Sequence, residues 1–148
     1  MMKIDINSIK QQIVLGLSED KIKIVNEASS PTETILTIDS TNNFRIEISE
    51  NTITILYCDE HDDFFLQTYK NENEFIDDAV KHILKLLHNK MLIEYVYSGN
   101  IMLSYKIWIV DKETNQKSIL KRVTTSLNPF LRLKQKSITI KEICFKNQ

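Results

Sequence analysis

Residues 71–88 read NENEFIDDAVKHILKLLH, and this stretch decides the fold class. Asn71 and Glu74 have the three-residue spacing of a capping box, which satisfies backbone groups at the start of a helix. Apolar residues then recur with helical spacing: Phe75, Ile76, Ala79, Val80, Ile83, Leu84 and Leu87. Acidic residues gather near the start and basic residues follow later, in agreement with the helix dipole. The pattern predicts a helix over about residues 72–89.

On both sides of this helix, apolar and polar residues alternate as they do in half-buried strands. The expected strands cover residues 21–25, 34–39, 44–48, 52–57, 62–69, 92–97, 101–110, 118–125 and 137–145. Residues 7–17 instead repeat with helical spacing, and Asn7 or Ser8 can cap that segment. Hairpin turns are expected at residues 49–51 and 98–100. We therefore predict an α+β fold: a mostly antiparallel sheet, one long helix and a short N-terminal helix.

The composition is that of an ordinary globular protein. The chain has 148 residues, of which 42% are hydrophobic and 26% charged. No linker, repeat or low-complexity tract interrupts it, so we expect residues 1–148 to form a single domain. The two glycines, Gly16 and Gly99, stand alone. Their isolation excludes a P-loop, a dinucleotide-binding fingerprint and a kinase glycine-rich loop.

The first residues and the two cysteines indicate a cytoplasmic protein. Residues 1–7 lack the apolar run of a signal peptide, and no stretch of about 18 uncharged apolar residues occurs. Cys58 and Cys144 lack a C-x-x-C spacing and suit small buried hydrophobic positions. We expect no membrane partner. Frequent Ile, Lys and Asn are typical of an AT-rich bacterial or phage genome.

The formal net charge of −1 hides an asymmetry along the chain. Residues 1–80 hold 6 basic and 16 acidic residues, and residues 81–148 hold 13 basic and 4 acidic ones. Such an asymmetry has two explanations. The two halves can neutralise each other, or each can serve a charged partner.

The densest polar feature is residues 59–63, which read DEHDD. Carboxylates and an imidazole can bind Mg²⁺ or Mn²⁺, but the stretch lacks the glycine and the spaced carboxylates of an EF-hand loop. A solvated hairpin turn between Tyr57 and Phe64 explains these charges without a metal. We expect no metal and no cofactor, and we interpret the cluster as negative charge offered to a basic partner.

No catalytic constellation can be recognised. His82 and His88 are six residues apart on the predicted helix and cannot share a metal on one face. No G-x-S-x-G motif exists, and neither cysteine lies beside a glycine or histidine. We expect that the protein is not an enzyme. The alternative is a site assembled from scattered residues, such as His61 or His82 with a distant carboxylate.

Basic residues of the C-terminal half support an alternative function as a nucleic-acid-associated module. The residues concerned are Lys117, Lys121, Arg122, Arg132, Lys134 and Lys136. Basic side chains near an aromatic one, here Phe130, can follow a phosphate backbone. Lysines that protect a strand edge against aggregation give the same pattern.

Residues 64–69 (FFLQTY), Asn71, residues 74–79 (EFIDDA) and residues 90–95 (KMLIEY) carry a family resemblance. Over about residues 64–97 the chain is similar to small immunity proteins that accompany bacterial polymorphic toxins, including those of the LXG type. Such families have no catalytic residues to carry over. The resemblance implies a cytosolic protein that binds and blocks its cognate toxin.

We therefore predict a binding protein that neutralises a protein partner, an immunity protein acting through an acidic surface. A nuclease toxin suits this prediction, because a basic substrate site attracts an acidic inhibitor. The predicted acidic contacts are Asp59, Glu60, Asp62, Asp63, Glu72, Asp77 and Asp78. Tyr57 and Tyr69 are predicted aromatic anchors, since tyrosine is enriched at interface cores.

Overall fold

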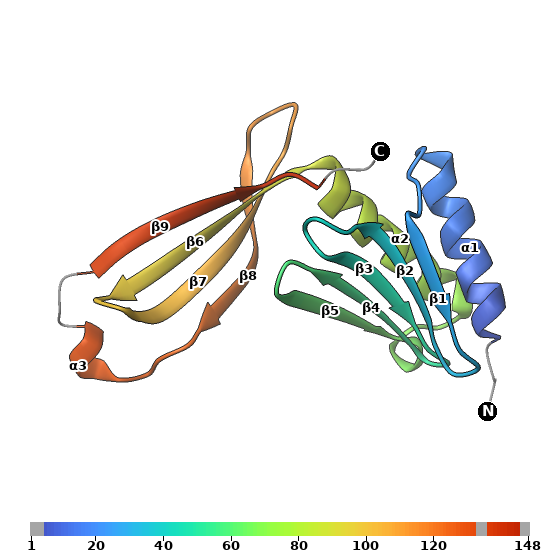
Figure 1. The fold of residues 1–148 in the computed structure, drawn as a ribbon, viewed down its shortest axis with the longest axis horizontal. Coiled ribbons are helices and arrows are strands. Elements are labelled where there is room, and N and C mark those ends of the chain that lie inside the picture. The colour runs from blue at the N-terminus through green and yellow to red at the C-terminus, as the bar shows by residue number, and fades with distance from the viewer. Residues whose placement is uncertain (1–4, 133–135, 146–148) are drawn as a thin grey trace. The chain divides into compact units, whose positions relative to one another are not determined.

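The computed structural model describes residues 5–132 and 136–145 (Figure 1). The predicted α+β class is confirmed, with the long helix and the short N-terminal helix in place and with antiparallel strands in two sheets. The chain divides into two compact units. Among the described residues, unit 1 comprises 5–85 and Phe145, and unit 2 comprises 86–132 and 136–144. A single domain would require these two units to pack together, and the expectation of one domain stays a prediction.

Unit 1 is built around a five-stranded antiparallel meander in the order β1-β2-β3-β4-β5. Its strands are β1 (Asn26–Ser29), β2 (Thr34–Asp39), β3 (Phe44–Ile48), β4 (Thr52–Tyr57) and β5 (Glu60–Phe65). Its helical elements are α1 (Ile6–Glu19), the 3₁₀ turn η1 (Leu66–Thr68) and α2 (Glu72–His88), whose last turn belongs to unit 2. The helices α1 and α2 lie on the same face of the sheet (Figure 1).

The core of unit 1 lies between this face and the two helices. Strict alternation along β3 and β4 points every second side chain inward, as expected for a sheet covered on one face. The fully buried side chains of the sheet and helices include Phe44, Ile46, Ile48, Ile53, Ile55, Tyr57, Ile9, Ile13, Leu17, Phe75, Ala79 and Ile83. Phe145 returns to this core, where its ring meets the edge of Phe44 at a centroid distance of 4.8 Å.

The helix caps agree with the prediction for α2 and correct it for α1. The Asn71 side chain accepts a hydrogen bond from the Glu74 N–H at 2.9 Å, so the predicted cap is confirmed. At α1 the Asp5 carboxylate accepts from the Asn7 N–H at 3.1 Å. The expected cap at Asn7 or Ser8 is therefore wrong, because the helix already begins at Ile6.

The expected strand at residues 21–25 is wrong. The N–H groups of Lys21 and Ile22 bond to carbonyls of Ser18 and Leu17, and Lys21 adopts φ 60°. These bonds close the end of α1, so the two residues are not available to a ladder. The strand begins at Asn26 instead, where four exposed residues pair with β2.

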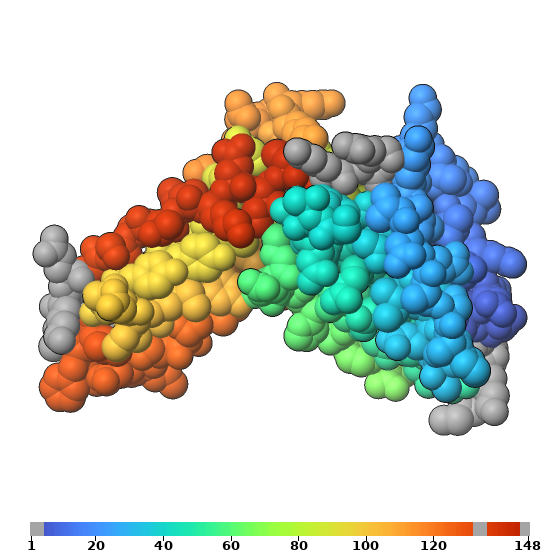
Figure 2. Space-filling model, in the orientation of Figure 1, coloured from blue at the N-terminus to red at the C-terminus, as the bar shows by residue number. Residues whose placement is uncertain are grey.

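Unit 2 contains a four-stranded antiparallel sheet in the order β8-β7-β6-β9. Its elements are β6 (Lys90–Ser98), β7 (Ile101–Val110), β8 (Lys117–Thr124), α3 (Pro129–Arg132) and β9 (Lys136–Ile143). The predicted turn between β6 and β7 is confirmed, and Gly99 adopts φ 59° there, a conformation that glycine allows without strain. The space-filling view shows β9, in red, as an outer strand beside β6 (Figure 2).

Candidate functional site

The predicted acidic turn at residues 59–63 is mostly a strand. Only Cys58 and Asp59 turn the chain, with Cys58 at φ 56°, and Glu60 already pairs with Tyr57. The expected strand over 62–69 is thus corrected to Glu60–Phe65, followed by η1. Because successive strand residues point to opposite faces, Glu60 and Asp62 share one face, and His61 and Asp63 share the other. The four carboxylates do not form a single surface.

Asp62 is held inside a hydrogen-bond network that joins β4, β5 and α2. The Tyr57 hydroxyl donates to Asp62 Oδ2 at 2.7 Å, and His82 Nε2 lies 2.7 Å from the same oxygen. The side chains of His82 and Asp62 are 18% and 20% exposed. The ring of Phe64 packs beside His82 at 5.5 Å. This network fastens α2 to the edge strand of the sheet.

Tyr57 belongs to the core and not to a contact surface. Its side chain is 0% exposed, so its prediction as a surface anchor is wrong. The inward position follows from the alternation of β4, in which Ile53, Ile55 and Tyr57 share the buried face. Burial raises the pKa of Tyr57 well above its usual range, and the hydrogen bond and negative charge of Asp62 raise it further.

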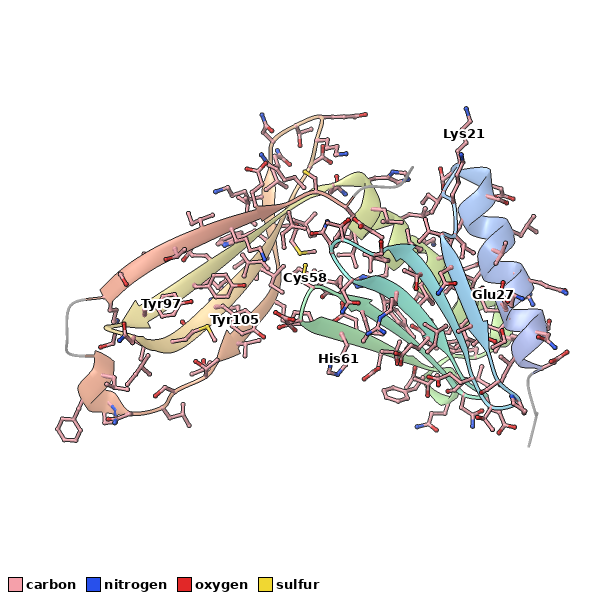
Figure 3. The ribbon with its side chains drawn as sticks, viewed as in Figure 1. Lys21, Glu27, Cys58, His61, Tyr97 and Tyr105 are labelled. Atoms are coloured by element: carbon pink, nitrogen blue, oxygen red, sulfur yellow. The ribbon has the colours of Figure 1, made fainter. Side chains whose placement is uncertain are left out.

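Asp63 and His61 lie on the opposite face of β5. Thr54 donates to Asp63 Oδ1 at 2.6 Å, and His61 Nε2 lies 3.7 Å from Asp63 Oδ2. The His61 side chain is 65% exposed (Figure 3). The two histidines proposed as scattered catalytic residues are thus directed to different faces of β5.

The start of α2 keeps three of the predicted contacts together. Asp77 and Asp78 are exposed, and Glu72 is half-buried with its Oε1 lacking a hydrogen-bond partner. Tyr69 packs its ring against Phe75 at 5.7 Å. Burial raises the pKa of Tyr69, and a hydrogen bond to Asp78 raises it further. Tyr69 and Asp78 therefore form one polar contact beside the helix.

A groove in unit 1 lies between α1 and α2. Its volume is about 320 Å³, and its lining consists of Gln12, Leu15, Gly16, Glu19, Asp20, Ile76, Asp77, Val80 and Leu84. The lining combines an apolar floor with three carboxylates and contains no lysine or arginine. Leu15 is 62% exposed at its edge. We call this feature the acidic groove.

Gly16 sets the depth of the acidic groove. A Cβ at this position would lie 3.1 Å from Val80 Cγ1, closer than ordinary van der Waals contact. The absence of a side chain at Gly16 lets Val80 of α2 approach the backbone of α1 closely. This site was not predicted from the sequence, although Leu15 and Glu19 lie outside the apolar stripe of α1 and therefore face outward on the helix.

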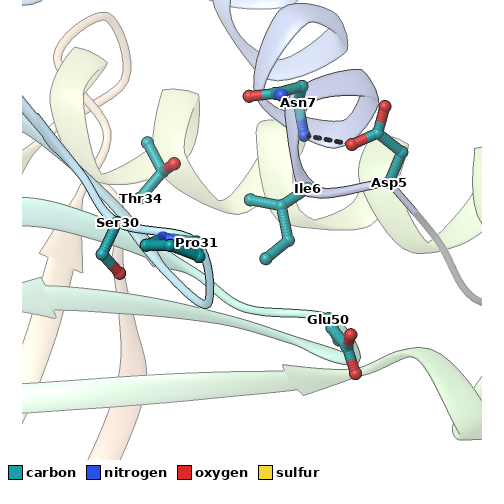
Figure 4. A pocket seen from close by; sticks show the side chains of 7 residues that line it. All are labelled: Asp5, Ile6, Asn7, Ser30, Pro31, Thr34 and Glu50. Atoms are coloured by element: carbon teal, nitrogen blue, oxygen red, sulfur yellow. Dashed lines mark hydrogen bonds between the residues drawn. The ribbon is translucent and has the colours of Figure 1, made fainter.

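A second hollow of about 370 Å³ lies at the other end of α1. It is lined by Asp5, Ile6, Asn7, Ser30, Pro31, Thr34 and Glu50 (Figure 4). Its Asp5 carboxylate is engaged in capping α1. The hollow contains no cationic side chain and no nucleophile paired with a base, so it does not suggest a reaction.

The residues predicted to bind nucleic acid lie on different elements of unit 2 and do not all share one face. Lys117, Lys121 and Arg122 lie on β8, and Lys136 begins β9. Lys121 and Arg122 are neighbours in a strand and therefore point to opposite faces of the sheet. Arg132 ends α3, and Lys134 lies outside the described residues.

Residues 5–132 and 136–145 contain neither a metal-ligand cluster nor a membrane-spanning helix. Within these ranges, no group of three or more His, Cys, Asp or Glu side chains is arranged to hold a metal ion. No helix there has the length and apolar character needed to cross a membrane. No protein-family model, curated protein or solved structure matches this chain.

Proposed function

We propose that this chain is a binding protein that neutralises a basic protein partner, and specifically an immunity protein that blocks a cognate bacterial toxin in the cytoplasm. The acidic groove of unit 1 is the observation that supports this proposal most. Glu19, Asp20 and Asp77 surround an apolar floor, with no cationic side chain in the lining. The proposal requires binding alone, without catalysis or a cofactor.

The chemistry of the acidic groove suits a basic, amphipathic segment of a partner. An apolar helix face can lie in a groove between two helices, and its basic residues then meet the acidic rim. Leu15 is exposed enough for a partner to cover it, and buried contacts at the centre of an interface dominate affinity. The described residues of unit 1 include 16 acidic and 7 basic ones, an excess of negative charge that attracts a basic protein at longer range.

The proposed contact surface differs from the predicted one. Asp77 lines the acidic groove, and Tyr69 with Asp78 extends the surface along α2. Asp62 is engaged with Tyr57 and His82, so we leave it out. Asp59 in the turn, and Glu60 and Asp63 on opposite faces of β5, do not join the acidic groove.

A growth-rescue experiment tests the immunity function. The polypeptide encoded by the neighbouring gene is expressed in a bacterial host alone and together with this chain. We expect growth arrest by the neighbour alone and restored growth with both, accompanied by an equimolar complex on size exclusion. A harmless neighbour, or a toxic one that this chain leaves active, would overturn the proposal.

A charge-neutralised variant tests the acidic groove separately. In Glu19→Gln/Asp20→Asn/Asp77→Asn we expect at least about a tenfold loss of affinity and a weaker salt dependence, because the complementary charges are gone. A matched control removes three exposed charges elsewhere in unit 1, with Glu50→Gln/Asp59→Asn/Glu74→Gln. Equal losses in both variants would show that net charge matters and the groove does not.

A further inference from the structure

The sheet of unit 2 has one face that carries three tyrosines on its two central strands. Tyr95 and Tyr97 lie on β6 and Tyr105 on β7, and all three are half-buried. The ring of Tyr95 lies 6.3 Å from that of Tyr97 and 6.0 Å from that of Tyr105. Tyr97 and Tyr105 are labelled in Figure 3, on the four-stranded sheet. We call this side the tyrosine face.

The strand register places lysines on both outer strands of the tyrosine face. Across the sheet, Lys121 on β8 pairs with Ile107, Ile107 with Ile93, and Ile93 with Lys141 on β9. The neighbouring row contains Tyr105 paired with Tyr95. Since adjacent strands are about 4.8 Å apart, the two lysines begin roughly 14 Å apart. They lie on either side of the buried Ile93 and Ile107, one row along the strands from the paired tyrosines.

The acidic residues of these strands all lie on the opposite face. Glu94 pairs with Lys106, Lys106 pairs with Arg122, and Glu142 pairs with Leu92. Glu142 also forms an ion pair with Lys90 at 3.4 Å. The opposite face therefore mixes both signs of charge. Among the described strand residues of unit 2, the charged side chains of the tyrosine face are lysines only.

We propose that the tyrosine face binds single-stranded nucleic acid, a function distinct from the binding proposed for unit 1. Aromatic rings on the central strands of an antiparallel sheet offer stacking surfaces for unpaired bases. Lys121 and Lys141, at the outer edges of the next row, then meet the phosphates of the same strand beyond the stacked bases. Acidic residues would repel phosphates, and they are confined to the other face. The combination favours a polyanion with flat bases over a protein partner.

The segment after β8 adds exposed apolar side chains at the tyrosine end of the sheet. Thr125 donates its N–H to the Leu103 carbonyl and its hydroxyl to the Met102 carbonyl, and Met102 pairs with Tyr97. Leu127 and Phe130 follow and are 84% and 74% exposed. Phe130 thus supplies a further aromatic ring in the same unit.

Fluorescence anisotropy of the full chain with labelled single-stranded oligo(dT) and oligo(U) tests the proposal. We expect binding at about 50 mM salt that weakens steeply as salt rises. Tyr97→Ala should weaken binding by about 5- to 150-fold, the range found for loss of one stacking ring. Tyr97→Phe should bind like the wild type, because the ring is kept. Failure of the wild type to bind any oligonucleotide would overturn the proposal.

A pair of adjacent residues gives the sharpest control, because both carry the same charge on one strand. Lys121→Gln should reduce the slope of log affinity against log salt by about 0.7, the value for one phosphate contact in a single strand. Arg122→Gln, on the opposite face, should leave the slope unchanged. Equal effects of the two variants would indicate diffuse attraction and overturn the assignment to the tyrosine face.

A protein partner for the same face gives a different pattern. If the tyrosine face joined two copies of this chain, Tyr97→Ala would lower the mass measured by sedimentation and leave oligonucleotide binding intact. That result would overturn the proposal. Circular dichroism of each variant confirms that the loss of binding occurs in a folded chain.

Discussion

The five-stranded sheet of unit 1 and the four-stranded sheet of unit 2 use the same antiparallel pairing but bury their side chains differently. In unit 1, every inward residue of β3 and β4 is fully buried. In unit 2, most residues of the outer strands β8 and β9 are exposed, including Ile138 and Ile140 at 63% and 60%. Burial of one face under helices stabilises the first sheet, whereas the second presents much of its surface to solvent.

The two units also differ in the sign of their charge. Among the described residues, unit 1 has 16 acidic and 7 basic residues, and unit 2 has 4 acidic and 9 basic ones. The asymmetry seen along the sequence therefore follows the division into units. The two proposed binding surfaces follow the same division, with the acidic groove in unit 1 and the tyrosine face in unit 2. The comparison teaches that the charge difference along the sequence is a difference between two compact units.

The largest expected effect comes from making the same substitution, Ile to Ala, once in each sheet and comparing the loss of stability. Ile55→Ala removes a fully buried side chain from unit 1 and should cost about 2–5 kcal/mol in the free energy of unfolding. Ile140→Ala removes an exposed side chain from unit 2 and should change it by no more than about 0.5 kcal/mol. Urea unfolding followed by circular dichroism measures both. Equal shifts would contradict the difference in burial between the sheets.

A smaller effect concerns the buried network of unit 1 at high pH. The pKa of Tyr57 is raised in the folded chain above its ordinary 10.0. Below that pH the protonated hydroxyl therefore makes its full contribution to the stability of the fold. As pH rises above about 10, the unfolded chain loses this proton more readily, and stability falls. Tyr57→Phe should remove that part of the decline, at a cost of about 1 kcal/mol near neutral pH for the lost hydrogen bond.

Urea midpoints between pH 8 and about 11 measure this effect in the wild type and in Tyr57→Phe. The two curves should converge as the pH rises. Curves that stay parallel would show that ionisation of Tyr57 does not contribute.

The smallest expected effect lies in the turn between β7 and β8 of unit 2. The Asp111 carboxylate accepts hydrogen bonds from the backbone N–H groups of Thr114 and Glu113 at 3.0 and 2.8 Å, which lower its pKa below the usual 3.8. The stabilisation from the charged Asp111 carboxylate is present above pH 3.8 and is lost as the pH falls through the lowered pKa. Asp111→Ala should speed hydrogen exchange at the Thr114 and Glu113 amides, measured by NMR, with the urea midpoint unchanged. Slow exchange in the variant would contradict the role of the carboxylate.

Several elements could be predicted because their signals are local. The cap at Asn71 and the apolar spacing of residues 75–87 predicted α2 to within one residue at its C-terminal end, and Gly99 predicted the turn between β6 and β7. The exposed strand β1 was missed because Asn26–Ser29 has no apolar alternation. The groove was missed because the apolar stripe of α1 predicts its buried side but not which element packs beside Gly16.

The sequence by itself determined the α+β class, the long helix, most strands and the opposite charge of the two halves, because each depends on residues close together in the chain. Only the tertiary structure decided which charges share a surface. The two-residue turn at Cys58 sets the register of β5, and a shift of one residue would exchange the faces of Asp62 and Asp63. In the same way, pairing of Lys121 with Ile107 places that lysine beside the tyrosines and Arg122 away from them. Sequence periodicity assigns a residue to one side of its own element, and only packing between elements decides what that side meets.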